Sequence, residues 1–207
     1  MKNPHINRRQ RWKRRVICLG ILLLSGCVST SPPARIYQLV ALSEAVAPDA
    51  GGKSQTLRLQ SVTLPGALHQ PTVVTQASPV VIQRSEFDRW AEPLEGHLSD
   101  VLTRNLAALL PEFHVVRGRM HPDLKADVSV HVEVLQFGGV LGESAHLEVR
   151  WSQSREGAAP VLHRWQGQRT LENDDVQVYV LAQSELLAEA SQALAQHLSG
   201  GGPSVPR

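Results

Sequence analysis

The amino-acid sequence predicts an α/β fold: a single domain in which two amphipathic helices pack on a mixed, mostly antiparallel sheet of about five or six strands. Apolar and polar residues alternate along several segments, which is the period of a half-buried strand. In two longer segments the apolar residues recur every three or four positions, which is the period of a helix. The order is strands, helix, strands and helix, and we place this domain at residues 35–199.

The chain starts with a basic segment and a short apolar run. Seven of the 21 Lys and Arg residues precede Cys27, and the apolar run at residues 16–24 is too short to cross a bilayer as a helix. The run closes in Leu-Ser-Gly-Cys, and the whole stretch resembles a bacterial lipoprotein signal. The resemblance implies that residues 1–26 are a signal peptide and that Cys27 becomes the lipidated first residue. The alternatives are an ordinary secretory signal with a chance cysteine and an uncleaved anchor.

Cleavage before Cys27 changes the composition of the chain. None of the 19 acidic residues lies in the removed segment, so the mature chain has 14 basic residues against 19 acidic ones, a formal net charge of −5. A mildly acidic body argues against nucleic acid as a partner. Cys18 is lost with the signal and Cys27 is blocked by lipid, so no thiol remains for catalysis, a disulfide or a thiolate metal site. This absence fits an oxidising periplasm.

The lipid anchor sets the expected location. One acyl chain holds a protein to a membrane only reversibly, whereas the multiple chains typical of lipoproteins hold it essentially permanently. Val28 follows the cysteine, where inner-membrane lipoproteins of enteric-type bacteria usually have aspartate. The resemblance therefore implies the periplasmic face of the outer membrane. No cofactor is expected other than the covalent acyl lipid on Cys27.

The first part of the mature chain has strand periodicity after a short tether. Residues 27–34 are small and contain two prolines, which suits a tether between lipid and domain. Leu57 and Leu59 alternate in one phase and Val62 and Leu64 in the other, which predicts a bulge near Ser61. We expect strands at residues 35–42, 55–64, 72–76 and 79–84, the last two joined as a hairpin.

The period then changes to that of a helix. Pro93 suits a first helical turn, Glu92 and Glu95 favour the positive end of the helix dipole, and Pro111 ends the helix. A short strand is expected at residues 113–117. The apolar stripe of the helix consists of Leu94, Leu98, Val101, Leu102, Leu106, Leu109 and Leu110.

Alternating segments return in the second half and are followed by a last helix. Asn173 or Asp174 is the expected N-cap of that helix, and glycines end it. Its apolar stripe is expected to pack on the sheet of its own domain, with binding of a lipid or a partner helix as the alternative. The expected elements are strands at 128–134, 145–151 and 161–171, the helix at 176–198, and a disordered tail at 200–207.

One run of residues is more specific than the periodicity. The sequence Arg89-Trp90-Ala91-Glu92-Pro93-Leu94 opens the first helix and resembles the PqiC/YmbA family, the auxiliary lipoproteins of ABC-type and MCE-type transport systems. The resemblance extends over residues 36–198. It departs from the family at Ala67-Leu68, where Tyr-Leu is frequent, and at Gln76, where arginine is frequent. Supporting pieces are Ile36-Tyr37-Gln38-Leu39, Val62-Thr63-Leu64-Pro65 and Gln70-Pro71-Thr72-Val73-Val74.

The resemblance implies a non-catalytic auxiliary subunit of an intermembrane lipid transport system. Its implied partners are an inner-membrane transporter and an MCE-domain protein that bridges the envelope, and it also allows for a homo-oligomer. The residues that we single out as candidates for partner binding are Arg89, Trp90, Glu92, Pro93 and Leu94. Trp and Arg are enriched at interface hot spots. The alternative interpretation is structural, with Trp90 covering a sheet end and Arg89 paired with Asp88 or Glu92.

Other functions have weaker support in the sequence. No Gly-x-Ser-x-Gly elbow, phosphate-binding loop or His-Glu-x-x-His segment is present, so we do not expect an enzyme. His131 and His146 lie on the polar phase of adjacent expected strands and would approach each other, but no third ligand accompanies them, so we expect no metal site. The alternatives to an adaptor are a periplasmic module that itself carries a lipid and an envelope hydrolase with a site built from scattered residues.

Overall fold

The computed structural model describes residues 32–41, 55–78, 80–118 and 125–200. Residues from Ala34 onwards form one compact unit. The signal peptide, the Cys27 attachment site, most of the tether and the tail after Gly200 lie outside the described residues, so these expectations stay predictions.

The predicted α/β class and the two helices are confirmed, but the strands form two sheets rather than one. The three-stranded sheet has the order β1 (Arg35–Tyr37), β4 (Val81–Trp90) and β3 (Thr72–Ser78). The five-stranded sheet has the order β5 (Phe113–Arg117), β2 (Gln55–Thr63), β6 (Val128–Val140), β7 (Ser144–Arg155) and β8 (Val161–Thr170). The helices are α2 (Leu94–Leu109) and α3 (Val176–Leu198), with a short 3₁₀ turn η1 (Gly66–Leu68) before β3.

Both sheets are mixed. The pairs β6–β7, β7–β8 and β3–β4 are antiparallel, whereas β1–β4, β2–β5 and β2–β6 are parallel. Antiparallel pairing thus joins the long strands of the second half, as expected, and the β3–β4 hairpin, whereas β1 and β2 pair only in parallel. The predicted bulge is confirmed, because the register between β2 and β6 shifts between Leu59 and Ser61.

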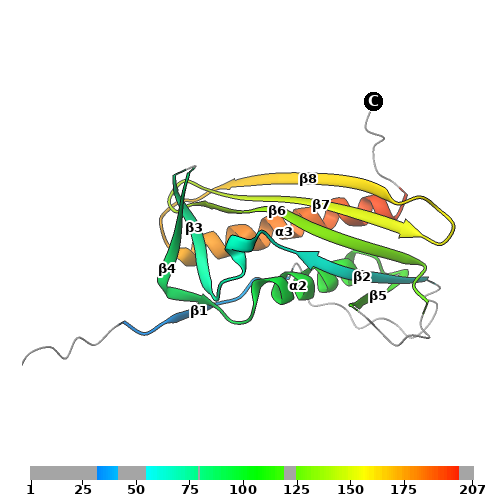
Figure 1. Ribbon diagram of the computed structural model, residues 1–207, viewed down its shortest axis with the longest axis horizontal. Coiled ribbons are helices and arrows are strands. Elements are labelled where there is room, and N and C mark those ends of the chain that lie inside the picture. Colours follow the sequence, from blue (N-terminus) through cyan, green and yellow to red (C-terminus); the bar gives the residue numbers. More distant parts are fainter. Residues whose placement is uncertain (1–31, 42–54, 79, 119–124, 201–207) are drawn as a thin grey trace, which may run out of the picture. The chain divides into compact units, whose positions relative to one another are not determined.

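The two helices cover the inner face of the five-stranded sheet. Helix α3 contacts β7 and β8, while α2 contacts β2 and β5 (Figure 1). The helices also meet each other, where buried Asn105 of α2 donates a hydrogen bond to Ser191 of α3 at 3.0 Å. Between the helices and the sheet Leu57, Trp151 and Tyr179 are almost completely buried. The stripe of the last helix therefore packs on its own domain, as predicted.

Several local details differ from the sequence predictions. Strand β4 continues to Trp90 instead of ending at residue 84, so Arg89 and Trp90 end a strand and do not open the helix, which begins at Leu94. Strand β6 continues to Val140 instead of ending at residue 134. The first strand ends at Tyr37 instead of residue 42, because Leu39 leaves the sheet edge and is buried in the core. The N-cap of α3 is Asp175, not Asn173 or Asp174, and its carboxylate accepts a hydrogen bond from the backbone N–H of Gln177 at 3.0 Å. Asn173 instead accepts from the backbone N–H of Asp175.

Candidate functional site

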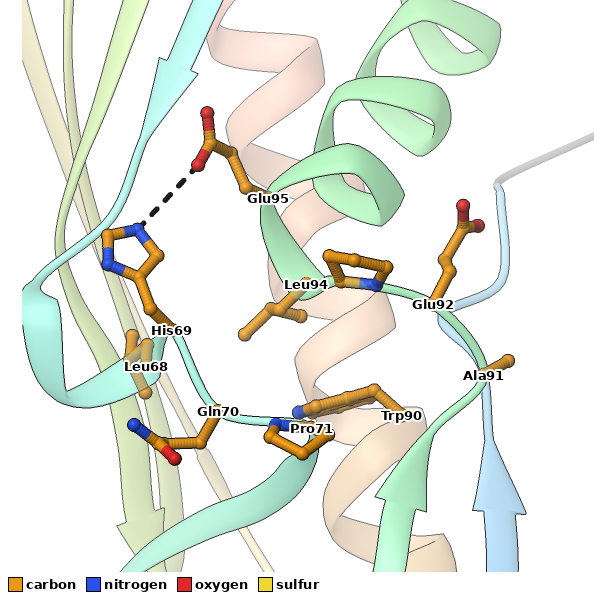
Figure 2. A pocket seen from close by; sticks show the side chains of 10 residues that line it. Leu68, His69, Gln70, Pro71, Trp90, Ala91, Glu92, Leu94 and Glu95 are labelled. Atoms are coloured by element: carbon orange, nitrogen blue, oxygen red, sulfur yellow. Dashed lines mark ion pairs between the residues drawn. The ribbon is translucent and has the colours of Figure 1, made fainter.

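A pocket of about 410 Å³ lies where β4 ends and α2 begins. Three segments of the chain form it: the η1–β3 connection, the last residue of β4 and the first turn of α2 (Figure 2). Four of the five predicted partner-binding residues line this pocket, and the fifth, Arg89, does not. The lining residues are Leu68, His69, Gln70, Pro71, Trp90, Ala91, Glu92, Pro93, Leu94 and Glu95.

Backbone hydrogen bonds fix the walls of the pocket. The N–H of Trp90 donates to the carbonyl of Pro71, and the N–H of Ala91 donates to the carbonyl of Tyr37, each at 2.9 Å. Pro93 has an extended backbone and is the N-cap of α2, so the chain turns there from strand to helix. The pocket walls are therefore tied to both neighbouring strands.

Apolar side chains form the floor of the pocket. Leu68, Trp90 and Leu94 are each at most 6% exposed. The Trp90 ring meets Phe137 and His97 edge-on, with centroid distances of 6.1 and 6.5 Å. The structural role that we considered for Trp90 is thus present, since most of its surface is in the core, and its remaining surface belongs to the pocket.

The rim of the pocket is polar and mainly acidic. Glu92 and Glu95 are exposed, and His69 lies with its Nε2 atom 3.6 Å from a carboxylate oxygen of Glu95 (Figure 2). His69 is the only lining residue that can carry a positive charge. An apolar floor with acidic groups around it suits an apolar ligand that also carries a positive charge.

Arg89 is exposed, and its expected ion pairs are absent. Asp88 pairs instead with Arg35 of β1, with 2.7 Å between Nε and the carboxylate oxygen. Burial alone would raise the pKa of Asp88, but hydrogen bonds from Arg35 and Ser85 outweigh burial and hold that pKa below its ordinary value. Among the residues described, the guanidinium of Arg89 has no salt-bridge partner.

A buried histidine links the pocket to the N-terminal segment. The Nε2 atom of His97 accepts a hydrogen bond from the backbone N–H of Leu39 at 3.1 Å. This places the proton of the neutral ring on Nδ1, which is buried and has no partner among the described residues. Burial lowers the pKa of His97, so the neutral form is favoured. Protonation at Nε2 would replace the acceptor that Leu39 needs with a second donor.

The predicted approach of His131 and His146 is wrong. His131 is opposite Ser152, whereas His146 is opposite Gly138, so their positions along β6 differ by seven residues, or roughly 23 Å. The polar phase was read correctly, but the register between the strands separates the two rings.

A different histidine pair comes together, which the sequence did not indicate. The rings of His163 on β8 and His197 on α3 have centroids 4.0 Å apart, beside Trp151. No group of three or more potential metal ligands occurs in the part of the chain that the structure describes.

Three further hollows among the described residues have a different character. One of about 530 Å³ and one of about 320 Å³ lie between polar side chains and share Gln136 and His146. Another of about 240 Å³ lies over the polar face of β2, β6 and β7. The Trp90 pocket combines an apolar floor with the most specific run of the sequence, so we take it as the candidate site.

The described helices include none that is both long enough and apolar enough to span a membrane.

Sequence reasoning missed the second wall of the pocket. Leu68, His69, Gln70 and Pro71 lie about twenty residues before Trp90 and have no periodicity of their own. Gln70-Pro71 was noted as a supporting piece of the resemblance, but nothing in the sequence indicated that it packs against Trp90.

Comparisons with known proteins agree on one family. The model of the family described as "ABC-type transport auxiliary lipoprotein component" matches residues 37–195. The chain is 28% identical to the intermembrane transport lipoprotein PqiC of Escherichia coli (strain K12), and to that of Shigella flexneri, over 171 residues. Each match covers 82% of this chain and 90% of the relative.

Solved structures share the fold. A crystal structure of an uncharacterized protein superposes with a TM-score of 0.68 at 21% identity, covering 81% of this chain and 99% of that one. Protein XCC0632 from Xanthomonas campestris superposes with a TM-score of 0.64 at 17% identity, covering 80% of this chain and 94% of its own.

Proposed function

Since the chain belongs to the family of ABC-type transport auxiliary lipoprotein components, we propose that it is the outer-membrane-anchored, periplasmic and non-catalytic auxiliary subunit of an intermembrane lipid transport system. Its partners in this proposal are an inner-membrane transporter and an MCE-domain protein that bridges the envelope. The observation that carries the proposal is that five of the six residues in the most specific run of the sequence, residues 90–94, build one wall of the candidate pocket. A family signature that opens onto the surface favours a contact with a partner.

The anchor in this proposal is the acylated Cys27. It lies eight positions before Arg35, the first residue of β1, so an extended tether spans at most roughly 28 Å. β1 pairs with β4, whose last residue is Trp90. The lipid would therefore hold the body within a short distance of the bilayer, and the pocket would lie beside the strand to which the tether connects.

The alternative is a carrier module that itself encloses a lipid, and the packing favours the adaptor. Leu57, Leu98 and Leu106 belong to one continuous cluster of buried apolar residues. The described hollows lie at the surface, and the apolar one has a volume of about 410 Å³. A carrier needs a large apolar interior space, which this packing does not offer.

The buried polar groups support a non-catalytic role. The carboxylate of Asp88 accepts hydrogen bonds from Arg35 and Ser85, and the ring of His97 accepts one from the backbone N–H of Leu39. These interactions hold β1 and the following segment on the body. Asp88 and His97, whose pKa values are lowered, thus have structural partners and do not converge with a nucleophile in the candidate pocket.

Photo-crosslinking in intact cells tests the proposal. A photoreactive amino acid at Glu92 is expected to capture the MCE-domain protein, while the same group at exposed Glu112, between α2 and β5, is not. Equal capture from both positions, or none from Glu92, would contradict docking at the pocket.

Fractionation of cells tests the anchor. The Cys27→Ser variant is expected to move from the outer-membrane fraction to the soluble periplasm. Unchanged fractionation would contradict the anchor.

A further inference from the structure

We infer that the Trp90 pocket binds an extended, proline-containing peptide segment with a neighbouring basic side chain, supplied by the protein partner of the transport system. This inference rests on the proposed function, because it names the part of the partner that docks. It follows from the rigidity, the openness and the charge of the pocket.

The rigidity comes from three rings. Trp90, Pro71 and Pro93 line the pocket, and none of them can change shape by rotating a flexible chain. Trp90 is also held from behind by Phe137 and His97. Figure 2 shows Trp90 and Pro71 next to each other at the base of the pocket. Flat, preformed surfaces of this kind bind proline rings at low entropic cost, because a polyproline helix is itself already ordered.

The shape of the pocket suits a segment that passes across it. It holds about 410 Å³ and is open on one side, which is enough for one or two apolar side chains. Gln70 lies at the edge with an amide that both donates and accepts hydrogen bonds (Figure 2). Such a group can pair with the backbone of an extended peptide, whose N–H and C=O groups are free.

The charge of the rim selects the flanking residue. Glu92 and Glu95 are exposed on the α2 side, and His69 is directed at Glu95. An acidic residue in the ligand would be repelled here, and a lysine or arginine would be attracted. The expected ligand is therefore a proline and a basic residue separated by a few positions.

Two other occupants have related chemistry. The chain itself contains Pro203-Ser204-Val205-Pro206-Arg207, which a second copy could offer. A small apolar molecule such as a fatty acid could enter the floor without using the rim. A segment of the protein partner is favoured over these two occupants, because the family is described as an auxiliary component of a transport system. The experiment separates all three.

The test uses the full acylated chain in detergent and a fluorescent synthetic peptide, Ala-Pro-Pro-Val-Pro-Arg, read by anisotropy. We expect saturable binding that weakens with added salt, and a loss of about tenfold in affinity for the Glu92→Lys, Glu95→Lys double variant. Glu112→Lys, a charge reversal away from the pocket, is the matched control and is expected to leave binding unchanged. Equal thermal midpoints would show that the variants are folded.

Defined results overturn the inference. These are no binding of the peptide, equal binding of a peptide with glutamate in place of arginine, and displacement by a fatty acid without any effect of the charge reversals. Tighter binding by a chain that ends at Gly200 would show that its own tail competes for the pocket and would overturn the partner as the source. If the peptide fails while Glu92 still crosslinks to the MCE-domain protein, the proposed function stands and this inference does not.

Discussion

Single residues of this protein often have two tasks. Trp90 is 6% exposed and packs on Phe137 and His97, yet its remaining surface forms a wall of the pocket. Replacing it by alanine would remove several kcal/mol of packing together with any binding. Recognition is therefore tested better at Glu92 and Glu95, whose side chains are exposed and contribute little to the core.

Asp88 gives a prediction on stability. Its carboxylate is 6% exposed and accepts from Arg35 and Ser85, so Asp88→Asn removes charge-assisted hydrogen bonds while keeping the shape. We expect a loss of about 1 kcal/mol in the free energy of unfolding, since Arg35 is itself largely exposed. Urea titration at neutral pH measures it.

The pKa of Asp88 sets where that contribution vanishes. The folded pKa lies below the ordinary 3.8, so the carboxylate stabilises the fold above that value, and the contribution is lost as the pH falls through the folded pKa. The difference between wild type and Asp88→Asn should shrink in strong acid. An equal difference at pH 7 and pH 2 would contradict the assignment.

His97 gives a prediction on pH dependence. Burial lowers its pKa below 6.5, so the unfolded chain takes up a proton at a pH where the folded chain does not. The contribution of His97 to the free energy of unfolding is therefore fully present above about pH 6.5 and decreases as the pH falls below that value. Glutamine at this position can still accept from Leu39 but cannot titrate, so His97→Gln should lose less stability on acidification.

Thermal unfolding between about pH 7.5 and about pH 5.5 checks this prediction, with an expected difference of a few degrees between wild type and variant. His163 also has a lowered pKa, first from burial and then from His197, and it remains in both proteins. His114 is exposed, so His114→Gln serves as the control. The same pH dependence in wild type and His97→Gln would contradict a lowered pKa of His97.

The elements with strong periodicity were predictable. Alternation identified β6 and β7, and the phase change in β2 located its bulge. Three-and-four spacing identified both helices to within about two residues. Periodicity does not reveal the register between two strands. It indicates which face of the sheet a residue occupies, but not which residue of the neighbouring strand lies opposite it. His131 and His146 share a face and are nonetheless far apart for this reason.

Two glycines give a paired prediction at this scale. Gly139, near the end of β6, has φ +152°, and a Cβ atom there would lie 2.1 Å from the carbonyl oxygen of Ser144. Gly139→Ala is therefore expected to cost at least about 2 kcal/mol. Gly96 lies inside α2 with nothing within 4 Å, so Gly96→Ala should stabilise by up to about 1 kcal/mol. Chemical denaturation of both variants measures the contrast, and similar effects of the two would contradict it.

The whole molecule depends on pairings between distant segments, which the sequence did not reveal. Alternation in 72–76 and 79–84 predicts a hairpin, but not that β1 joins it in parallel to make a separate sheet. The pocket needs both pairings: the β3–β4 hairpin places Pro71 beside Trp90, with a hydrogen bond between their backbones, and β1 accepts a hydrogen bond from Ala91 through the carbonyl of Tyr37. The sequence could thus supply the Trp90 side of the site, while the Pro71 side required the fold.

The segment that follows the tether, residues 35–41, gives the last prediction. Residues 35–41 are held by the Arg35 ion pair, by Leu39 in the core, and by the N–H of Val40, which donates to Ser184 of α3 at 3.1 Å. A chain that starts at Ala34 should therefore unfold at the same midpoint as the mature protein. A chain that starts at residue 42 should lose at least about 3 kcal/mol, because Leu39 leaves a cavity and His97 loses its partner.

Calorimetry of the two truncated chains makes the comparison, with the peptide probe as a second measurement. Ala91 donates to the carbonyl of Tyr37, so removal of β1 also frees one wall of the pocket and should weaken peptide binding. If the shorter chain kept both its midpoint and its peptide affinity, this segment would be only a linker. If it loses both, any pull on the lipid anchor acts directly on the strand that supports the docking pocket.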